Sequence, residues 1–147
     1  MKKIKVSEAS GPVLDWLVAT AEGHRISLSR NWYSAQDEES FSMKMSWKRD
    51  DAPDSVHWWA GQRYSPSTDW SQGGPIIETK IDCLRKRSKA EEASLAYPNP
   101  NFKFKAEIFA DIDGYFCAFG PTPLIAGLRC FVVSRLGETV EVPGELT

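Results

Sequence analysis

Residues 122–137 read TPLIAGLRCFVVSRLG and predict the clearest element of the chain, a helix. Thr122 is a favourable N-cap, Pro123 suits the first turn, and Gly137 suits the left-handed end. Arg129 lies at the edge of the apolar stripe, where its stem can be covered while its guanidinium reaches a cleft. The stripe predicted to be buried recurs at helical spacing and consists of Leu124, Ile125, Leu128, Val132 and Leu136.

A β-hairpin is predicted directly before this helix. Residues 102–109 alternate apolar with charged side chains, residues 111–114 form a DIDG turn, and residues 115–119 return. Four further strands are expected from apolar runs and alternation, at residues 24–29, 41–47, 56–60 and 75–84.

A second helix is predicted near the amino terminus, over residues 12–22. Ser10 can cap it and Gly23 can end it, and its apolar face lies opposite Asp15, with Trp16 on the flank. The order helix, strands, hairpin, helix predicts an α+β fold. We expect a single domain in which an antiparallel sheet is packed with an N-terminal and a C-terminal helix; the 147 residues suffice for one such domain.

The composition narrows the class of function. A net charge of -2 argues against binding nucleic acid through bulk charge, and the basic run at residues 85–89 is interpreted as a solvated face rather than a phosphate track. No apolar run approaches the ~20 residues that span a membrane, and residues 1–6 lack the apolar core of a signal peptide. Three widely spaced cysteines fit a reducing compartment. We therefore expect a soluble cytoplasmic protein without a membrane partner.

Residues 64–78 read YSPSTDWSQGGPIIE, a composition that predicts a shaped loop rather than a helix or a strand. In the functional interpretation, Ser67, Thr68 and Asp69 hold a polar ligand while Tyr64 or Trp70 stacks on a flat ring. In the structural interpretation, Asp69 or Thr68 bonds nearby backbone amides and holds the turn. Both interpretations stay open for Asp69.

Two further places can be read as anion sites. The amides of Gly73 and Gly74 can approach an anion, although a tight turn before a strand is the favoured interpretation. The helix start at Thr122 is a natural anion site that Arg129 can strengthen, although capping already accounts for that residue. The two histidines lie far apart and no nucleophile elbow is present, so no catalytic residue, metal ligand or cofactor is predicted.

Three blocks of the sequence resemble the family of the phage NinX protein. They are residues 14–16 (LDW) with 21–23 (AEG), residues 64–70 with 73–78, and residues 120–126 continuing through 129–131 to 136–137. The resemblance implies one NinX-like domain over residues 1–147, with insertions at about 31–56 and 85–101. It implies a bacteriophage accessory protein acting in the host bacterial cell, and it supplies no catalytic residues.

Three hypotheses about function follow. The first is a non-enzymatic binder of a small polar or nucleotide-like ligand, which could sequester a host defence signal. The second is a protein–protein interaction module that inhibits or adapts a host or phage protein, with some of the six tryptophans as anchors and a homo-oligomer as one outcome. The third, ranked below both, is a nucleotide hydrolase using Asp69 and a carboxylate such as Glu78.

Overall fold

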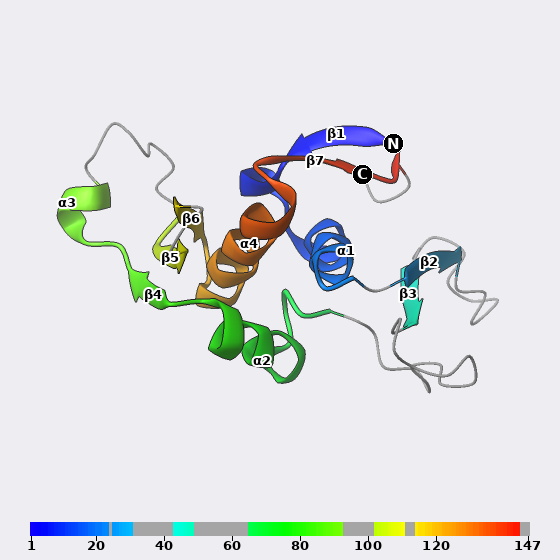
Figure 1. Cartoon of the computed structure of the whole chain (residues 1–147), viewed down its shortest axis with the longest axis horizontal. Coiled ribbons are helices and arrows are strands. Elements are labelled where there is room, and N and C mark those ends of the chain that lie inside the picture. The colour runs from blue at the N-terminus through cyan, green and yellow to red at the C-terminus, as the bar shows by residue number, and fades with distance from the viewer. Residues whose placement is uncertain (24, 31–42, 49–64, 93–101, 111–113, 145–147) are drawn as a thin grey trace, which may run out of the picture.

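The computed structural model describes residues 1–23, 25–30, 43–48, 65–92, 102–110 and 114–144 (Figure 1). The predicted α+β class is confirmed, because helices pack against antiparallel strands. The elements are, in order, β1 (Lys2–Lys5), the 3-10 turn η1 (Val6–Glu8), α1 (Gly11–Ala21), β2 (Arg25–Arg30), β3 (Met43–Lys48), α2 (Trp70–Lys80), β4 (Cys83–Lys86), α3 (Lys89–Glu92), β5 (Phe104–Ala110), β6 (Gly114–Gly120), α4 (Pro123–Leu136) and β7 (Thr139–Val142).

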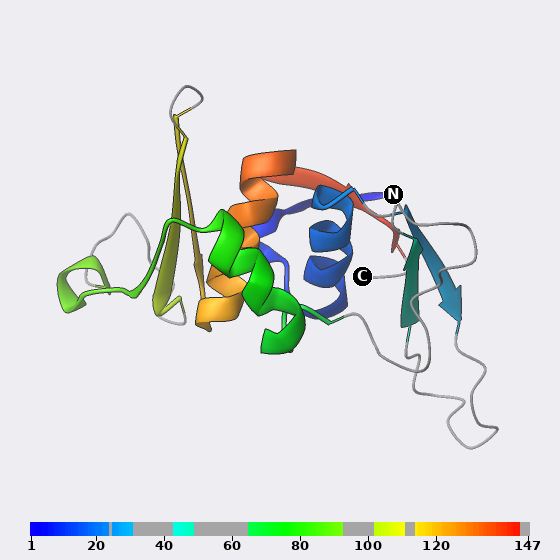
Figure 2. The same ribbon diagram turned by 60° about the horizontal axis from the view of Figure 1, so that its bottom comes forward.

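Helix α4 is the centre of the molecule. The sheet of β4, β5 and β6 covers one side of it, and α1 and α2 cover the other (Figure 2). The larger apolar cluster lies between α4, α1 and β7 and includes Leu14, Leu17, Leu128, Phe131 and Val142. A smaller cluster joins α4 to the sheet through Ala106, Ala118, Ala126 and Cys130. Because it has neighbours on both sides, α4 is buried over most of its length.

The predicted ends of α4 are confirmed, but the predicted set of buried residues is wrong at Leu136 and Arg129. The Thr122 hydroxyl accepts from the backbone N–H of Ile125 at 3.1 Å, and Gly137 has φ +89°. Leu136 is 36% exposed, however, while Arg129 is only 4% exposed. A single stripe suits a helix at a surface, whereas α4 is enclosed between two layers.

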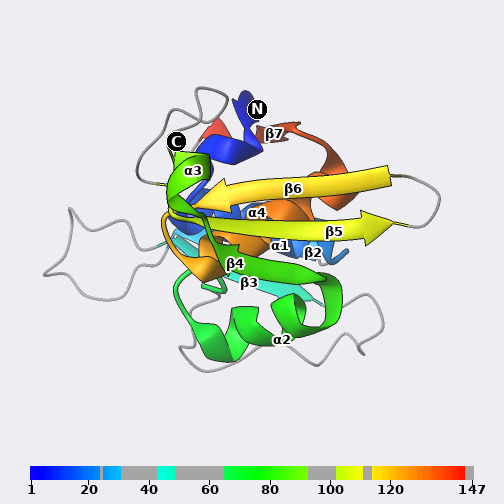
Figure 3. The ribbon, with the colours of Figure 1, turned by 90° about the vertical axis from the view of Figure 1, so that its left-hand side faces the viewer.

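The predicted hairpin of β5 and β6 is confirmed and forms part of a three-stranded antiparallel sheet. Figure 3 shows the sheet in front of α4, with the order β4–β5–β6. Lys105 is opposite Arg85 on one side and Phe119 on the other, and Phe109 is opposite Tyr115. This register places alternate residues of β5 on the side of α4 and on the opposite side.

Two other strand pairs lie elsewhere in the fold. Strands β2 and β3 pair antiparallel close to the predicted positions, with Ile26 opposite Trp47. Strands β1 and β7 bring the two ends of the chain together, with Lys2 opposite Val142. This second pair was not predicted, because four residues at each end carry only a short alternation. The strand expected at residues 56–60 lies outside the described residues.

Helix α1 confirms the predicted amino-terminal helix to within a residue. Pro12 lies in its first turn and Gly23 follows it with φ +81°, although the Ser10 side chain makes no capping hydrogen bond. Trp16 packs against the larger apolar cluster while remaining partly exposed. Asp15 is 4% exposed, so it does not lie on a solvent face.

The largest correction concerns residues 70–84. The sequence predicts a loop with a Gly-Gly-Pro turn and then a strand, but residues 70–80 form helix α2 and only Cys83–Lys86 form a strand. Gly73 and Gly74 have helical backbones, without the positive φ that a tight turn needs. Helix propensity alone disfavours two glycines and a proline in a helix interior. The capping group before α2 and the packing of its first turn, described below, override that preference.

None of the described helices is both long and apolar enough to cross a bilayer.

Candidate functional site

The segment at residues 65–69, which leads into α2, is fixed to α1 by a buried hydrogen bond. The backbone N–H of Ser67 donates to Asp15 Oδ1 at 2.8 Å, and the Ser67 hydroxyl lies 3.5 Å from the carbonyl oxygen of Gly11. Ser67 is 3% exposed and Pro66 is fully buried. Ser67 therefore faces the protein interior, where it holds the segment in place.

Bonds within the segment complete its shape. The backbone N–H groups of Thr68 and Asp69 both donate to the carbonyl oxygen of Ser65, at 3.1 and 2.9 Å. The N–H of Ser65 donates to Gln72 Oε1 at 2.8 Å, which ties the segment back to the first turn of α2. The Thr68 hydroxyl is exposed and lies 3.4 Å from the Ser65 carbonyl oxygen. The segment is thus a closed turn with few free backbone groups.

Asp69 is the N-cap of α2. Its Oδ1 accepts from the Ser71 backbone N–H at 2.9 Å and from the Ser71 hydroxyl at 2.6 Å, and its Oδ2 accepts from Gln72 Nε2 at 3.2 Å. Hydrogen bonds from the Ser71 side chain and backbone hold the pKa of this carboxyl below its ordinary value. Of the two interpretations of Asp69, the geometry supports capping.

The two glycines of α2 have different surroundings. A Cβ on Gly73 would collide with the carbonyl oxygen of Pro66 and would lie 2.6 Å from Leu124 Cδ1. A Cβ on Gly74 would meet only Trp70 Cε3, at 3.6 Å. Gly73 is therefore required where α2 packs against residue 66 and α4, whereas a Cβ at Gly74 would be in ordinary contact with the indole of Trp70.

Arg129 is a structural residue of the interior. Its Nε donates to the carbonyl oxygen of Ala9 at 2.8 Å, and its Nη1 donates to that of Phe119 at 2.9 Å. The guanidinium carbon lies 5.1 Å from the centre of the Phe102 ring. Burial lowers the pKa of Arg129. The guanidinium thus joins three separate parts of the chain, and it does not reach out from the end of α4.

Some of the predicted site residues are brought to one end of the helices. Helices α1, α2 and α4 begin at the same end (Figure 2). The contact between Gly73 and Leu124 joins the first turns of α2 and α4 there. Thr122 is exposed beside this contact, and Trp70 is 52% exposed. Tyr64 lies outside the described residues.

Sequence reasoning missed Asp15 as the anchor of the segment. Its position opposite the apolar face of α1 indicated a solvent-exposed residue, and the partner that buries it lies 52 positions away. The only signal was its place in the LDW block at residues 14–16. Lys86 and Lys89 of the basic run are exposed, as predicted for a solvated face, but Arg87 is 5% exposed and its guanidinium lies 5.0 Å from the centre of the Phe119 ring.

Groups of three or more histidine, cysteine, aspartate or glutamate side chains that could hold a metal ion are absent from the part of the chain that the structure describes. Both histidines, His24 and His57, lie outside that part.

Comparison with known proteins agrees with this architecture. No curated protein sequence matches the chain. A family model described as NinX of bacteriophage P22 matches residues 5–135, which span α1, the segment before α2, the β5–β6 hairpin and nearly all of α4. The chain belongs to the bacteriophage P22 NinX family.

Proposed function

We propose that this phage accessory protein acts by noncovalent binding, and that Trp70 is the main contact for its ligand. The observation that carries the proposal is the 52% exposed indole of Trp70 at the start of α2. An exposed tryptophan on a rigid support offers a large contact area at a small cost in conformational entropy.

Hydrogen bonds on both sides of the turn before α2 hold the backbone that carries Trp70 in place. Asp69 caps the helix in which Trp70 is the first residue, and the preceding turn is fixed to Asp15 through Ser67. One edge of the indole lies close to Gly74, where even a Cβ would be in contact with it, and the rest of the ring accounts for its 52% exposure. A flat ring can therefore stack beside Trp70 without a rearrangement of the loop, which favours affinity.

The chemistry around Trp70 favours a small planar molecule with an anionic group. Pro121 and Thr122, exposed at the start of α4, lie at the positive end of its helix dipole, which attracts negative charge. The ionised Asp69 already occupies the start of α2, so an anion is better accommodated at α4. A nucleotide-like molecule has both parts, and in a phage its sequestration would remove a host defence signal.

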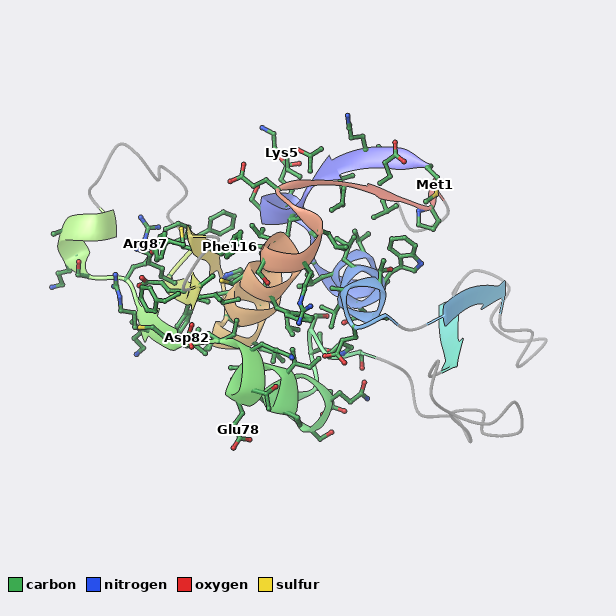
Figure 4. All side chains as sticks on the ribbon, in the orientation of Figure 1. Met1, Lys5, Glu78, Asp82, Arg87 and Phe116 are labelled. Atoms are coloured by element: carbon green, nitrogen blue, oxygen red, sulfur yellow. The ribbon has the colours of Figure 1, made fainter. Side chains whose placement is uncertain are left out.

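Binding rather than hydrolysis fits the two carboxylates best. Asp69 is engaged as a cap, and its lowered pKa makes it a weak base. Glu78 lies nine positions along α2, about 13 Å further along the axis at 1.5 Å per residue. Its side chain points away from α4 (Figure 4). The two groups cannot act on one reacting atom.

Thermal unfolding against mono-, di- and cyclic nucleotides and ADP-ribose tests the proposal. A ligand at a hundred times its Kd adds about 2.7 kcal/mol, which raises the Tm by several degrees. The rise should vanish in Trp70→Ala and persist in Leu136→Ala, which removes another exposed apolar side chain. The ligand should be recovered intact. An unchanged Tm across the panel, or a rise that survives in Trp70→Ala, contradicts the proposal.

A protein partner is the second candidate, and the same exposed indole favours it. Tryptophan is enriched among the residues that dominate protein interfaces. In this case nucleotides leave the Tm unchanged, while a host or phage protein co-purifies with the wild type and not with Trp70→Ala. If the partner is a second copy of this chain, the Trp70→Ala variant should have a smaller oligomeric mass than the wild type.

A further inference from the structure

A second surface lies on the face of the β4–β5–β6 sheet turned away from α4, here called the outer sheet face. Ala106 and Ala118 point toward α4, where they contact Ala126 and Cys130. Because side chains alternate along a strand, their neighbours in sequence point the other way. The outer sheet face therefore carries four cations, Arg85, Arg87, Lys103 and Lys105, and three aromatic residues, Phe109, Tyr115 and Phe119.

The cations and rings of the outer sheet face are interleaved. Lys105 Nζ lies 6.0 Å from the centre of the Tyr115 ring and 5.8 Å from that of Phe119. The guanidinium carbon of Arg87 lies 5.0 Å from the centre of the Phe119 ring, and Figure 4 shows Arg87 beside the sheet. Such contacts hold positive charge directly above aromatic carbon.

One carboxylate, that of Glu107, lies among these groups. It accepts from the Tyr115 hydroxyl at 2.8 Å and lies 3.7 Å from Arg85 Nε and 3.9 Å from Lys105 Nζ. It therefore acts as the internal anchor of the cluster. Among the paired strand residues that alternate onto this face, two cations, Arg85 and Lys105, stand beside this carboxylate, and Lys103 and the buried Arg87 flank the strand ends, in a chain whose net charge is -2.

The rings at the turn end of the sheet are open to solvent. Phe109 is 59% exposed and Tyr115 is 48% exposed. Their centroids are 5.6 Å apart and their planes are inclined by 33°. Soluble proteins normally cover side chains of this size, and a pair of them next to a row of cations is typical of a binding surface.

We propose that the outer sheet face binds single-stranded DNA. Phosphates are drawn to Arg85, Lys103 and Lys105, and bases stack on Phe109 and Tyr115, the combination by which single strands are bound without regard to sequence. Glu107, which could accept from a ribose 2′-hydroxyl, already accepts from the Tyr115 hydroxyl and lies beside Arg85 and Lys105, which disfavours selection for RNA. The surface is separate from Trp70, and it modifies the expectation drawn from net charge alone.

Fluorescence anisotropy with a labelled 20-nucleotide oligo-dT tests this proposal. Binding at low salt should weaken as salt rises, with a slope of log K against log salt of about −2 to −3, since each neutralised phosphate of a single strand contributes about −0.7. A duplex of the same length should bind at least tenfold more weakly, because its bases cannot stack on the rings. An oligo-U strand should bind no better than oligo-dT.

Matched variants locate the site. Arg85→Glu with Lys103→Glu should weaken oligo-dT binding at least tenfold. Lys2→Glu with Lys5→Glu on β1 changes the net charge equally, away from the sheet, and should weaken it far less. The double variant Phe109→Ala with Tyr115→Ala should also bind oligo-dT at least tenfold more weakly. A cooperative thermal transition should show that this variant still folds.

Several results would overturn the proposal. They are no binding of oligo-dT at low salt, equal losses in the two charge-reversal pairs, a duplex that competes equally, or an RNA strand that binds more than tenfold tighter than DNA. An acidic protein that occupies this face while oligo-dT does not would assign it to a different partner.

Discussion

The Ser67 backbone N–H and the Asp15 carboxylate meet at 2.8 Å across 52 positions of the chain, and both residues are buried. This contact fixes the turn before α2 to α1. It explains how a segment rich in small polar residues becomes part of the core. The exposed indole of Trp70 thereby gains a rigid base.

Removal of the acceptor should loosen this region first. Asp15→Ala leaves a buried N–H without a partner, which should cost about 2–3 kcal/mol and lower the Tm by about 5–10 °C. Asp15→Asn keeps an acceptor oxygen and should recover at least half of the loss. Amide exchange at Ser67 should accelerate in the alanine variant before the amides of α4 do. An unchanged Tm in Asp15→Ala would contradict the role given to this residue.

Asp69 should affect stability through its charge state. Its folded pKa is lowered, so its stabilising effect is present above the unfolded value of about 3.9 and is lost as pH falls through the folded pKa. At pH 6, Asp69→Ala should lower the Tm by about 2–4 °C, and Asp69→Asn by less because asparagine also caps.

The pH series supplies the control for Asp69. As pH falls from 6 toward 2, the Tm of the wild type should approach that of Asp69→Asn. A gap between these two proteins that widens on acidification would contradict the assignment of Asp69 as an ionised cap.

Arg129 should matter to stability rather than to ligand binding. Arg129→Ala removes the hydrogen bonds to the carbonyl oxygens of Ala9 and Phe119 and opens a cavity, so the loss should be about 2–4 kcal/mol in urea unfolding. Arg129→Lys keeps the charge, but one ammonium cannot reproduce the two directed bonds, and it should recover only part of the loss. A nucleotide affinity lost in a still-folded Arg129→Lys would instead place the guanidinium in the site.

Much of the fold was predictable from local patterns. The ends of α4 carry strong signals in Thr122, Pro123 and Gly137, and the β5–β6 hairpin alternates over its whole length. The same local reasoning underestimated the burial of α4. Arg129 and Cys130 are buried because a sheet and a helix layer both cover α4, and no periodicity within one helix specifies a second layer.

The candidate site was less predictable because its residues act through distant partners. Gly73 and Gly74 resemble a turn by composition, and only the packing of residue 73 against Pro66 and Leu124 explains a helix there. Asp69 could be read as a ligand group or as a cap until the position of Ser71 was known. Trp70 is 52% exposed, and its role in stacking on a ligand stays a prediction.

The central claim is that residues 70–80 are a helix whose first turn is docked on α4, and a pair of glycine variants tests it most directly. Gly73→Ala places a Cβ against Pro66 and Leu124, so it should destabilise by about 1–3 kcal/mol in thermal or urea unfolding. A Cβ on Gly74 meets Trp70 only at an ordinary contact, but the helix propensity that Gly74→Ala gains is offset by crowding of the new Cβ against the following Pro75, so this variant should change stability by less than about 0.5 kcal/mol. A loss clearly larger in Gly73→Ala than in Gly74→Ala supports the docked helix; destabilisation of similar size in both variants would contradict it and restore the turn.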